Sequence, residues 1–218
     1  MKLLPLATLL VATPVLAAPP ADAIVALWTS APPSHGEIPD AMPLRFAMFD
    51  DGRVFVGGTS EIGAGKLDKK NMKPIEKELE RVGKMGLSGP QAFGPGDAMF
   101  RLSIRRVGEI VAKGDPSRAP AKVGTLAELV QRLLEFQHPS LRPYTPASYA
   151  VAARESGLPG GCRSWLLPVT LADALKQPQI IPATSVYGWP TGGTPAVVCS
   201  SDRRYAVTFR PLLPGETP

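Results

Sequence analysis

Few residues of this chain could do chemistry directly. Its 218 residues include two histidines, His35 and His138, and two cysteines, Cys162 and Cys199. A tetrahedral metal site needs four such ligands close together, and two thiols far apart in the sequence with two scattered imidazoles do not make a convincing set. The sequence therefore predicts no metal site.

Two short motifs come close to active-site signatures but are incomplete. Residues 63–66 read Gly-Ala-Gly-Lys, yet a phosphate-binding loop also needs Gly where Ser60 stands and Ser or Thr where Leu67 stands. Residues 86–89 are one residue short of the nucleophile elbow of hydrolases, and no Asp is placed to complete a triad with either histidine. Neither motif predicts a catalytic residue, and no cofactor is expected.

Carboxylates are the remaining candidates for catalysis. Asp50 and Asp51 lie in a predicted turn, where Asp is favoured because it hydrogen-bonds its own backbone. The acids of 76–80 alternate with basic residues on a predicted exposed helix face. No acid pair stands in an apolar setting that would separate two pKa values, as acid–base hydrolysis requires. We expect a protein without catalysis; the alternative is an envelope hydrolase whose carboxylates converge only in the fold.

Residues 1–17 have the pattern of a secretory signal peptide. Lys2 precedes a short apolar run, and Val15 and Ala17 occupy the small-residue positions of a cleavage site. The run is too short and too interrupted by proline to be a permanent membrane span, although an uncleaved anchor is the alternative. We expect an exported protein, periplasmic or extracellular, with no transmembrane segment after cleavage.

Export changes the interpretation of the two cysteines. In an oxidising compartment, an even number of cysteines favours a disulfide, here Cys162 with Cys199. Closing a loop of roughly 40 residues would stabilise the fold by about 4 kcal/mol in the chain-entropy model.

Proline and glycine, 25 and 21 residues, divide the chain into short elements. Residues 18–42 are rich in Ala and Pro and predict an extended leader, of which Ile24, Leu27 and Trp28 could dock on the folded part. Residues 43–218 then form a single domain with a disulfide-closed loop at 162–199.

Two hairpin–helix units make up the first half of this domain. The first has alternating strands around Asp51-Gly52, a turn in which both central residues would need positive φ, then a helix capped by Asn71. The second has strands around Gly108 and a helix that opens with a capping box, Thr125 and Glu128, and ends at His138. At an offset of 56, Phe46 falls on Leu102, Met48 on Ile104 and Gly52 on Gly108. We interpret this as repeated architecture, without claiming gene duplication.

A looser third unit follows. A strand at 149–153, a partner strand at 163–167, a short helix from Thr170 and a last strand at 205–209 are predicted. The simplest fold is a two-layer α+β domain: an antiparallel sheet of about six to eight strands with two main helices on one face.

Two surfaces are candidates for binding. Arg101 and Arg105 alternate with apolar residues and should stand together on the outer face of the sheet, near Arg203 and Arg204, where they could meet an anionic envelope polymer or an acidic protein. Ordinary solubility is the alternative. Nucleic acid is not expected, because no basic stripe with aromatics between its cations is present.

The second candidate is loop 186–193, which carries Tyr187 and Trp189 inside the disulfide-closed segment. Aromatics on a stapled loop are preorganised contact groups. Alternatively, both rings pack on the core. The sequence thus favours an exported binding protein of unknown partner, with a peptidase inhibitor that presents this loop as a further alternative.

Overall fold

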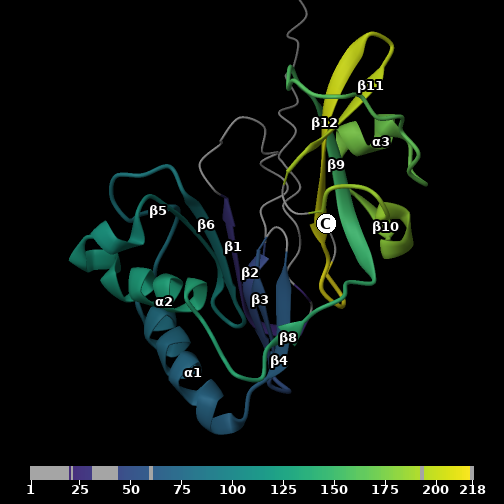
Figure 1. The fold of residues 1–218 in the computed structure, drawn as a ribbon. Coiled ribbons are helices and arrows are strands. Elements are labelled where there is room, and N and C mark those ends of the chain that lie inside the picture. The colour runs from purple at the N-terminus through teal and green to yellow at the C-terminus, as the bar shows by residue number, and fades with distance from the viewer. Residues whose placement is uncertain (1–19, 21, 31–43, 59–60, 192–193, 217–218) are drawn as a thin grey trace, which may run out of the picture.

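The computed structural model describes residues 20, 22–30, 44–58, 61–191 and 194–216 (Figure 1). The predicted signal peptide and His35 lie outside these residues. The described chain forms an eight-stranded sheet, called the large sheet, and a four-stranded sheet, called the small sheet. The predicted α+β class is confirmed.

The large sheet has the strand order β5-β7-β6-β1-β2-β3-β4-β8 and is antiparallel except where β5 meets β7. Its strands are β1 (Ala23–Ser30), β2 (Leu44–Phe49), β3 (Arg53–Gly57), β4 (Ile62–Lys66), β5 (Gln91–Ala92), β6 (Met99–Ile104), β7 (Gly108–Lys113) and β8 (Arg142–Pro143).

The strand β1 corrects the predicted domain boundary. The sequence placed residues 23–30 in a leader outside the domain, whereas the structure places them between β6 and β2 in the middle of the sheet. Val25 and Leu27 face one core, Ala26 and Trp28 face another, and all four are buried. A strand buried on both faces shows no apolar–polar alternation, which is why its pattern did not predict a strand.

The two predicted hairpins flank β1 in matching register. Leu27 lies opposite Phe46 of β2 on one side and opposite Leu102 of β6 on the other. Val25 likewise lies between Met48 and Ile104. The residue pairs that the offset of 56 aligned therefore share the same partner on the central strand.

The turns of these hairpins also correspond. Gly52 has φ +83° and Gly108 has φ +107°, so both adopt a backbone that favours glycine. The expected two-residue turn at Asp51-Gly52 is wrong in one respect: Asp51 does not have a positive φ. The chain instead makes a longer loop in which Gly52 alone takes that conformation and donates from its amide to the carbonyl of Phe49.

Helices α1 (Lys69–Lys84) and α2 (Gly124–Leu134) cover one face of the large sheet (Figure 1). The N-cap of α1 is Asp68, which accepts from the amide of Asn71 at 2.8 Å, so the predicted Asn71 cap is wrong by three residues. Short 3-10 turns, η2 (Pro116–Arg118) and η3 (Ala121–Val123), precede α2. Because η3 runs directly into α2, the predicted Thr125 capping box does not form, and the N-cap Val123 makes no side-chain bond.

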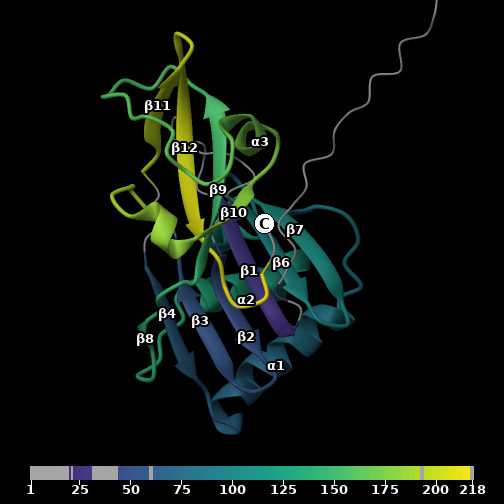
Figure 2. The same cartoon turned by 90° about the vertical axis from the view of Figure 1, so that its right-hand side faces the viewer.

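A different segment packs against the other face of the large sheet. Leu213, which follows β12, and Tyr144 pack with Trp28, Phe49 and Phe55. Figure 2 shows the end of the described chain crossing toward the large sheet. The segment is held by Glu216, which pairs with Arg210 and accepts from the amide of Leu213 at 2.9 Å.

The small sheet has the order β10-β9-β12-β11. Its strands are β9 (Ser148–Glu155), β10 (Gln179–Pro182), β11 (Ala196–Ser200) and β12 (Arg203–Pro211), and it carries α3 (Leu171–Lys176) and η4 (Ala183–Val186). Residues 163–167 do not form the predicted strand: Arg163 makes a single bridge to Val198. No helix in the described part of the chain is long and apolar enough to cross a membrane.

Candidate recognition turn

The predicted disulfide between Cys162 and Cys199 is confirmed, with 5.3 Å between the two Cα atoms. It ties segment 161–165 to the edge strand β11. Beside it, the amide of Arg163 donates to the carbonyl of Val197 at 2.9 Å, and the amide of Cys199 donates to the carbonyl of Arg163 at 3.4 Å. The disulfide and these bonds together fix the position of Arg163.

Residues 186–189, here called the Tyr187 turn, have the geometry of a type II β-turn. The amide of Trp189 donates to the carbonyl of Val186 at 3.0 Å. Tyr187 has φ −58° and ψ 128°, and Gly188 has φ +76°. This turn type places a positive φ at its third residue, so glycine is the residue that fits there without strain.

Both ends of the Tyr187 turn are anchored, whereas its tip is not. Val186 is buried in the core of the small sheet. Trp189 packs against the same core, and its ring lies 5.3 Å from that of Phe209. Tyr187 is 95% exposed. The structure thus separates the two aromatics that the sequence grouped together: Trp189 packs on the core and Tyr187 faces solvent.

Arg163 connects the turn to the disulfide. Its Nη1 donates to the carbonyl of Gly188 at 2.5 Å, and its guanidinium lies 5.7 Å from the centre of the Trp189 ring. A cation over an aromatic face is attracted to it, so Arg163 holds both the backbone and the anchor of the turn. No local pattern predicts this contact, because Arg163 and Gly188 are distant along the chain.

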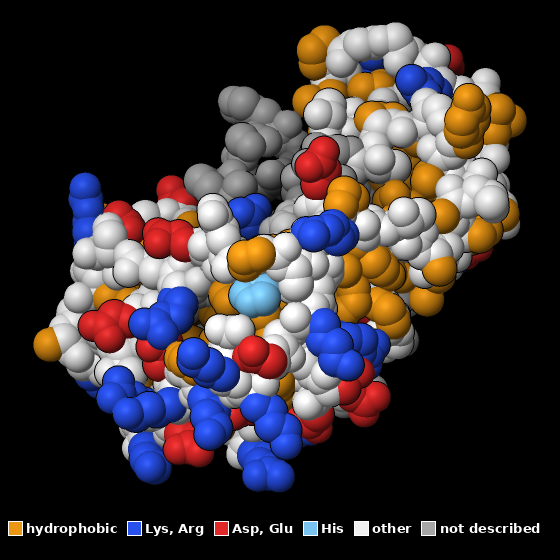
Figure 3. All heavy atoms as spheres, turned by 60° about the horizontal axis from the view of Figure 1, so that its bottom comes forward, with side chains coloured by type: hydrophobic (Ala, Val, Ile, Leu, Met, Phe, Trp, Pro, Cys, Tyr) orange, Lys and Arg blue, Asp and Glu red, His pale blue; other side chains and the backbone are white. Residues whose placement is uncertain are grey.

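Further exposed apolar side chains belong to the same part of the molecule. Leu166 is 82% exposed, and Ile180 and Leu175 are about half exposed. In Figure 3, hydrophobic side chains are frequent on the small-sheet part at the upper right, whereas Lys and Arg gather on the lower part of the view. An exposed apolar surface of this kind is typical of a contact site for another macromolecule.

Arg101, the first predicted basic residue, is buried. Its side chain pairs with Glu109 at 2.7 Å, and its guanidinium lies 4.8 Å from the ring centre of Trp28. It stands on the outer face of the sheet, as expected, but it is covered and paired there. Its role in the structure is to pack on Trp28.

Arg105 is partly exposed and bonded to its own fold. It pairs with Asp50 and donates to the carbonyls of Asp22 and Ala23, so it joins the β6–β7 turn to the start of β1. Arg203 and Arg204, which were expected nearby, belong to the small sheet, where Arg203 pairs with Glu155 at 3.2 Å. The predicted basic residues are therefore divided between two sheets.

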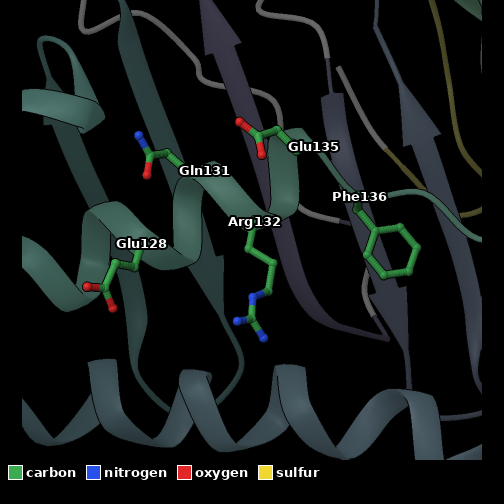
Figure 4. A pocket seen from close by; sticks show the side chains of 5 residues that line it. All are labelled: Glu128, Gln131, Arg132, Glu135 and Phe136. Carbon is green, nitrogen blue, oxygen red and sulfur yellow. The ribbon is translucent and has the colours of Figure 1, made fainter.

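A hollow of about 410 Å³ lies along α2 and is lined by Glu128, Gln131, Arg132, Glu135 and Phe136 (Figure 4). Arg132 points toward α1, where it pairs with Glu78 at 2.8 Å. Glu128 and Glu135 stand on either side of Arg132 and do not point at each other. Within the described ranges, no three acids, histidines or cysteines are grouped so that they could hold a metal ion.

His138 has a local role. Its Nδ1 lies 2.8 Å from the hydroxyl of Ser140, and its ring stacks on Phe136.

Comparison with protein-family models, with curated proteins and with solved structures finds no match for this chain.

Proposed function

We propose that this chain is an exported, non-catalytic binding protein that contacts a protein partner through the Tyr187 turn. The observation that carries the proposal is the 95% exposure of Tyr187 between the buried Val186 and Trp189, which packs on the same core. The proposal of export rests on the residue pattern of 1–17 and on the disulfide, which is a bond of oxidising compartments.

A rigid turn suits this function. Binding is weakened by the loss of conformational freedom, and a turn that is already fixed by a hydrogen bond, a buried anchor and an arginine loses little. Tyrosine is also enriched among the residues that dominate protein interfaces. A protein partner is favoured over a polyanion because the small-sheet part, which carries the turn, exposes apolar side chains such as Leu166.

The test begins with a partner captured by chemical crosslinking to the full chain and then purified. Its Kd is measured by calorimetry for the native chain, for Tyr187→Ala and for Val107→Ala. Val107 is a matched control, because it is a half-exposed apolar residue of the large-sheet part. We expect Tyr187→Ala to raise Kd by about 30-fold, as loss of an interface anchor does, and Val107→Ala to leave it unchanged.

Unchanged affinity in Tyr187→Ala would overturn the proposal. If the captured partner is a protease, the same variants are assayed for inhibition. The peptidase-inhibitor alternative then predicts that Tyr187→Ala abolishes inhibition. Loss of inhibition in the anchor variant Trp189→Ala alone would not support it.

A further inference from the structure

Helix α1 carries a row of basic side chains that the Tyr187 turn does not involve. Lys69, Lys70, Lys73, Lys77, Arg81 and Lys84 are all exposed, and we call them the basic ridge. Figure 3 views the molecule from the side of α1 and shows Lys and Arg side chains gathered there. The sequence pattern drew attention to the acids of this helix and not to this row.

The spacing of the basic ridge places all six cations on one side. At 100° per residue they fall within an arc of about 120°, along a helix of about 24 Å. The buried residues of α1 point the opposite way, into the core. Of the three acids of the helix, Glu80 lies inside that arc and Glu76 lies just outside its edge. Glu78 is turned toward α2, where it pairs with Arg132.

The cations of the basic ridge form no ion pairs with described carboxylates. Among the described residues, no carboxylate lies within ion-pair distance of any of its six cations, whereas nine other ion pairs form elsewhere. Like charges at spacings of three and four destabilise an isolated helix slightly. The basic ridge therefore leaves a concentrated positive potential on one surface.

We propose that the basic ridge docks the protein on an anionic lipid surface. The ridge is the convex outer side of a helix, so a plane can meet all six cations at once. Five of the six are lysines, compact charges on flexible stems that suit the diffuse charge of lipid headgroups better than paired recognition of one phosphate.

The neighbouring turn supports a lipid surface over a soluble polyanion. A Cβ built on Gly83 would lie 3.0 Å from a methyl group of Val107, which places the β6–β7 turn beside the C-terminal half of α1. That turn adds the exposed Arg106 and the apolar Val107, which is 44% exposed. Cations beside an exposed apolar side chain are typical of surfaces that lie at a lipid interface.

Docking through α1 is compatible with the proposed function and independent of it. In Figure 1, α1 lies at one end of the molecule and β11 at the other. A chain held by the basic ridge would leave the Tyr187 turn accessible on the small-sheet part.

The test is cosedimentation of the full chain with vesicles of phosphatidylcholine, with and without phosphatidylglycerol. The ridge variant is Lys70→Gln, Lys73→Gln and Lys77→Gln together. The matched control, Lys113→Gln, Lys122→Gln and Lys176→Gln, removes the same charge at exposed positions elsewhere. Circular dichroism verifies that both variants fold.

We expect the native chain to bind only the vesicles with phosphatidylglycerol, more weakly as salt is raised. Each lysine lost from the basic ridge should lower the partition coefficient about fivefold, so the ridge variant should bind about 100-fold less well. Binding of the control variant should be much less affected. Tyr187→Ala should bind like the native chain, which separates this proposal from the previous one.

Three results would overturn the proposal. They are absence of binding by the native chain, equal loss in the ridge and control variants, and capture of inorganic polyphosphate without capture of vesicles. The last would assign the ridge to a soluble polyanion.

Discussion

Two aromatic residues separated by a single glycine have opposite roles in this protein. Trp189 packs on Phe209, and Tyr187 is almost fully exposed. We predict that Trp189→Ala lowers the free energy of unfolding by about 2 kcal/mol, part of the loss typical of a fully buried aromatic. Tyr187→Ala should change it by less than about 0.5 kcal/mol. Urea denaturation measures both, and equal destabilisation would contradict the assignment.

The pair formed by Arg210 and Glu216 is a second residue-scale determinant. Their side chains are 5% and 0% exposed, and the second Glu216 oxygen accepts from the amide of Leu213. Glu216→Ala leaves Arg210 buried without its partner, so we expect a loss of about 3–5 kcal/mol. Glu216→Gln keeps an acceptor and should be milder. An unchanged Tm for Glu216→Ala in thermal melts would exclude a stabilising role of the segment that follows β12.

Tyr144 should make the free energy of unfolding fall at alkaline pH. Burial raises the pKa of its phenol, and the nearby Glu216 charge raises it further. Between the unfolded pKa near 10 and the higher folded pKa, the native state binds more protons than the unfolded state, so stability falls as pH rises. We expect Tyr144→Phe to reduce this loss in denaturation above pH ~10. Tyr187→Phe, which removes an exposed phenol, is the control.

At the scale of elements, the start of α1 tests which residue caps it. Asp68 accepts from the amide of Asn71, and the sequence alone favoured Asn71 as the cap. We predict that Asp68→Ala lowers the free energy of unfolding by about 1 kcal/mol and that Asn71→Ala changes it little. A larger effect of Asn71→Ala in chemical denaturation would restore the sequence-based cap.

Local patterns predicted elements well where one face is apolar. The strands around Gly52 and Gly108 and the helix containing Ile75 and Leu79 were found because alternation and helical period are local properties. Elements were missed where apolar and polar residues do not alternate or where a neighbouring element decides the boundary. The doubly buried β1 did not alternate, and the start of α2 depends on the 3-10 turn before it.

The candidate site was predictable only in part. The cysteine count and the apparent signal peptide predicted the disulfide, and the sequence indicated a loop with Tyr187 and Trp189. The contacts that distinguish the two rings are long-range. Trp189 meets Phe209 and Arg163 meets Gly188, and no spacing rule relates residues so far apart.

At the scale of the whole molecule, the disulfide acts on one of three apolar cores. The small sheet has its own apolar cluster, separate from those of the large sheet. We predict that Cys162→Ser with Cys199→Ser destabilises the fold by up to about 4 kcal/mol and speeds amide hydrogen exchange in β9–β12 more than in β1–β3. Uniform acceleration across both sheets would show that the molecule opens as one unit.

The position of β1 determines the order in which the chain can assemble. Val25 lies opposite Met48 on one side and opposite Ile104 on the other, and all three belong to the same layer. Ile104 follows much later in the chain than Met48. During synthesis from the N-terminus, the central strand appears first and its second neighbour much later. A strand with apolar residues on both faces is then exposed on one edge until the second hairpin is made. Folding should therefore be slow and late, and the emerging chain should bind chaperones that recognise extended apolar segments.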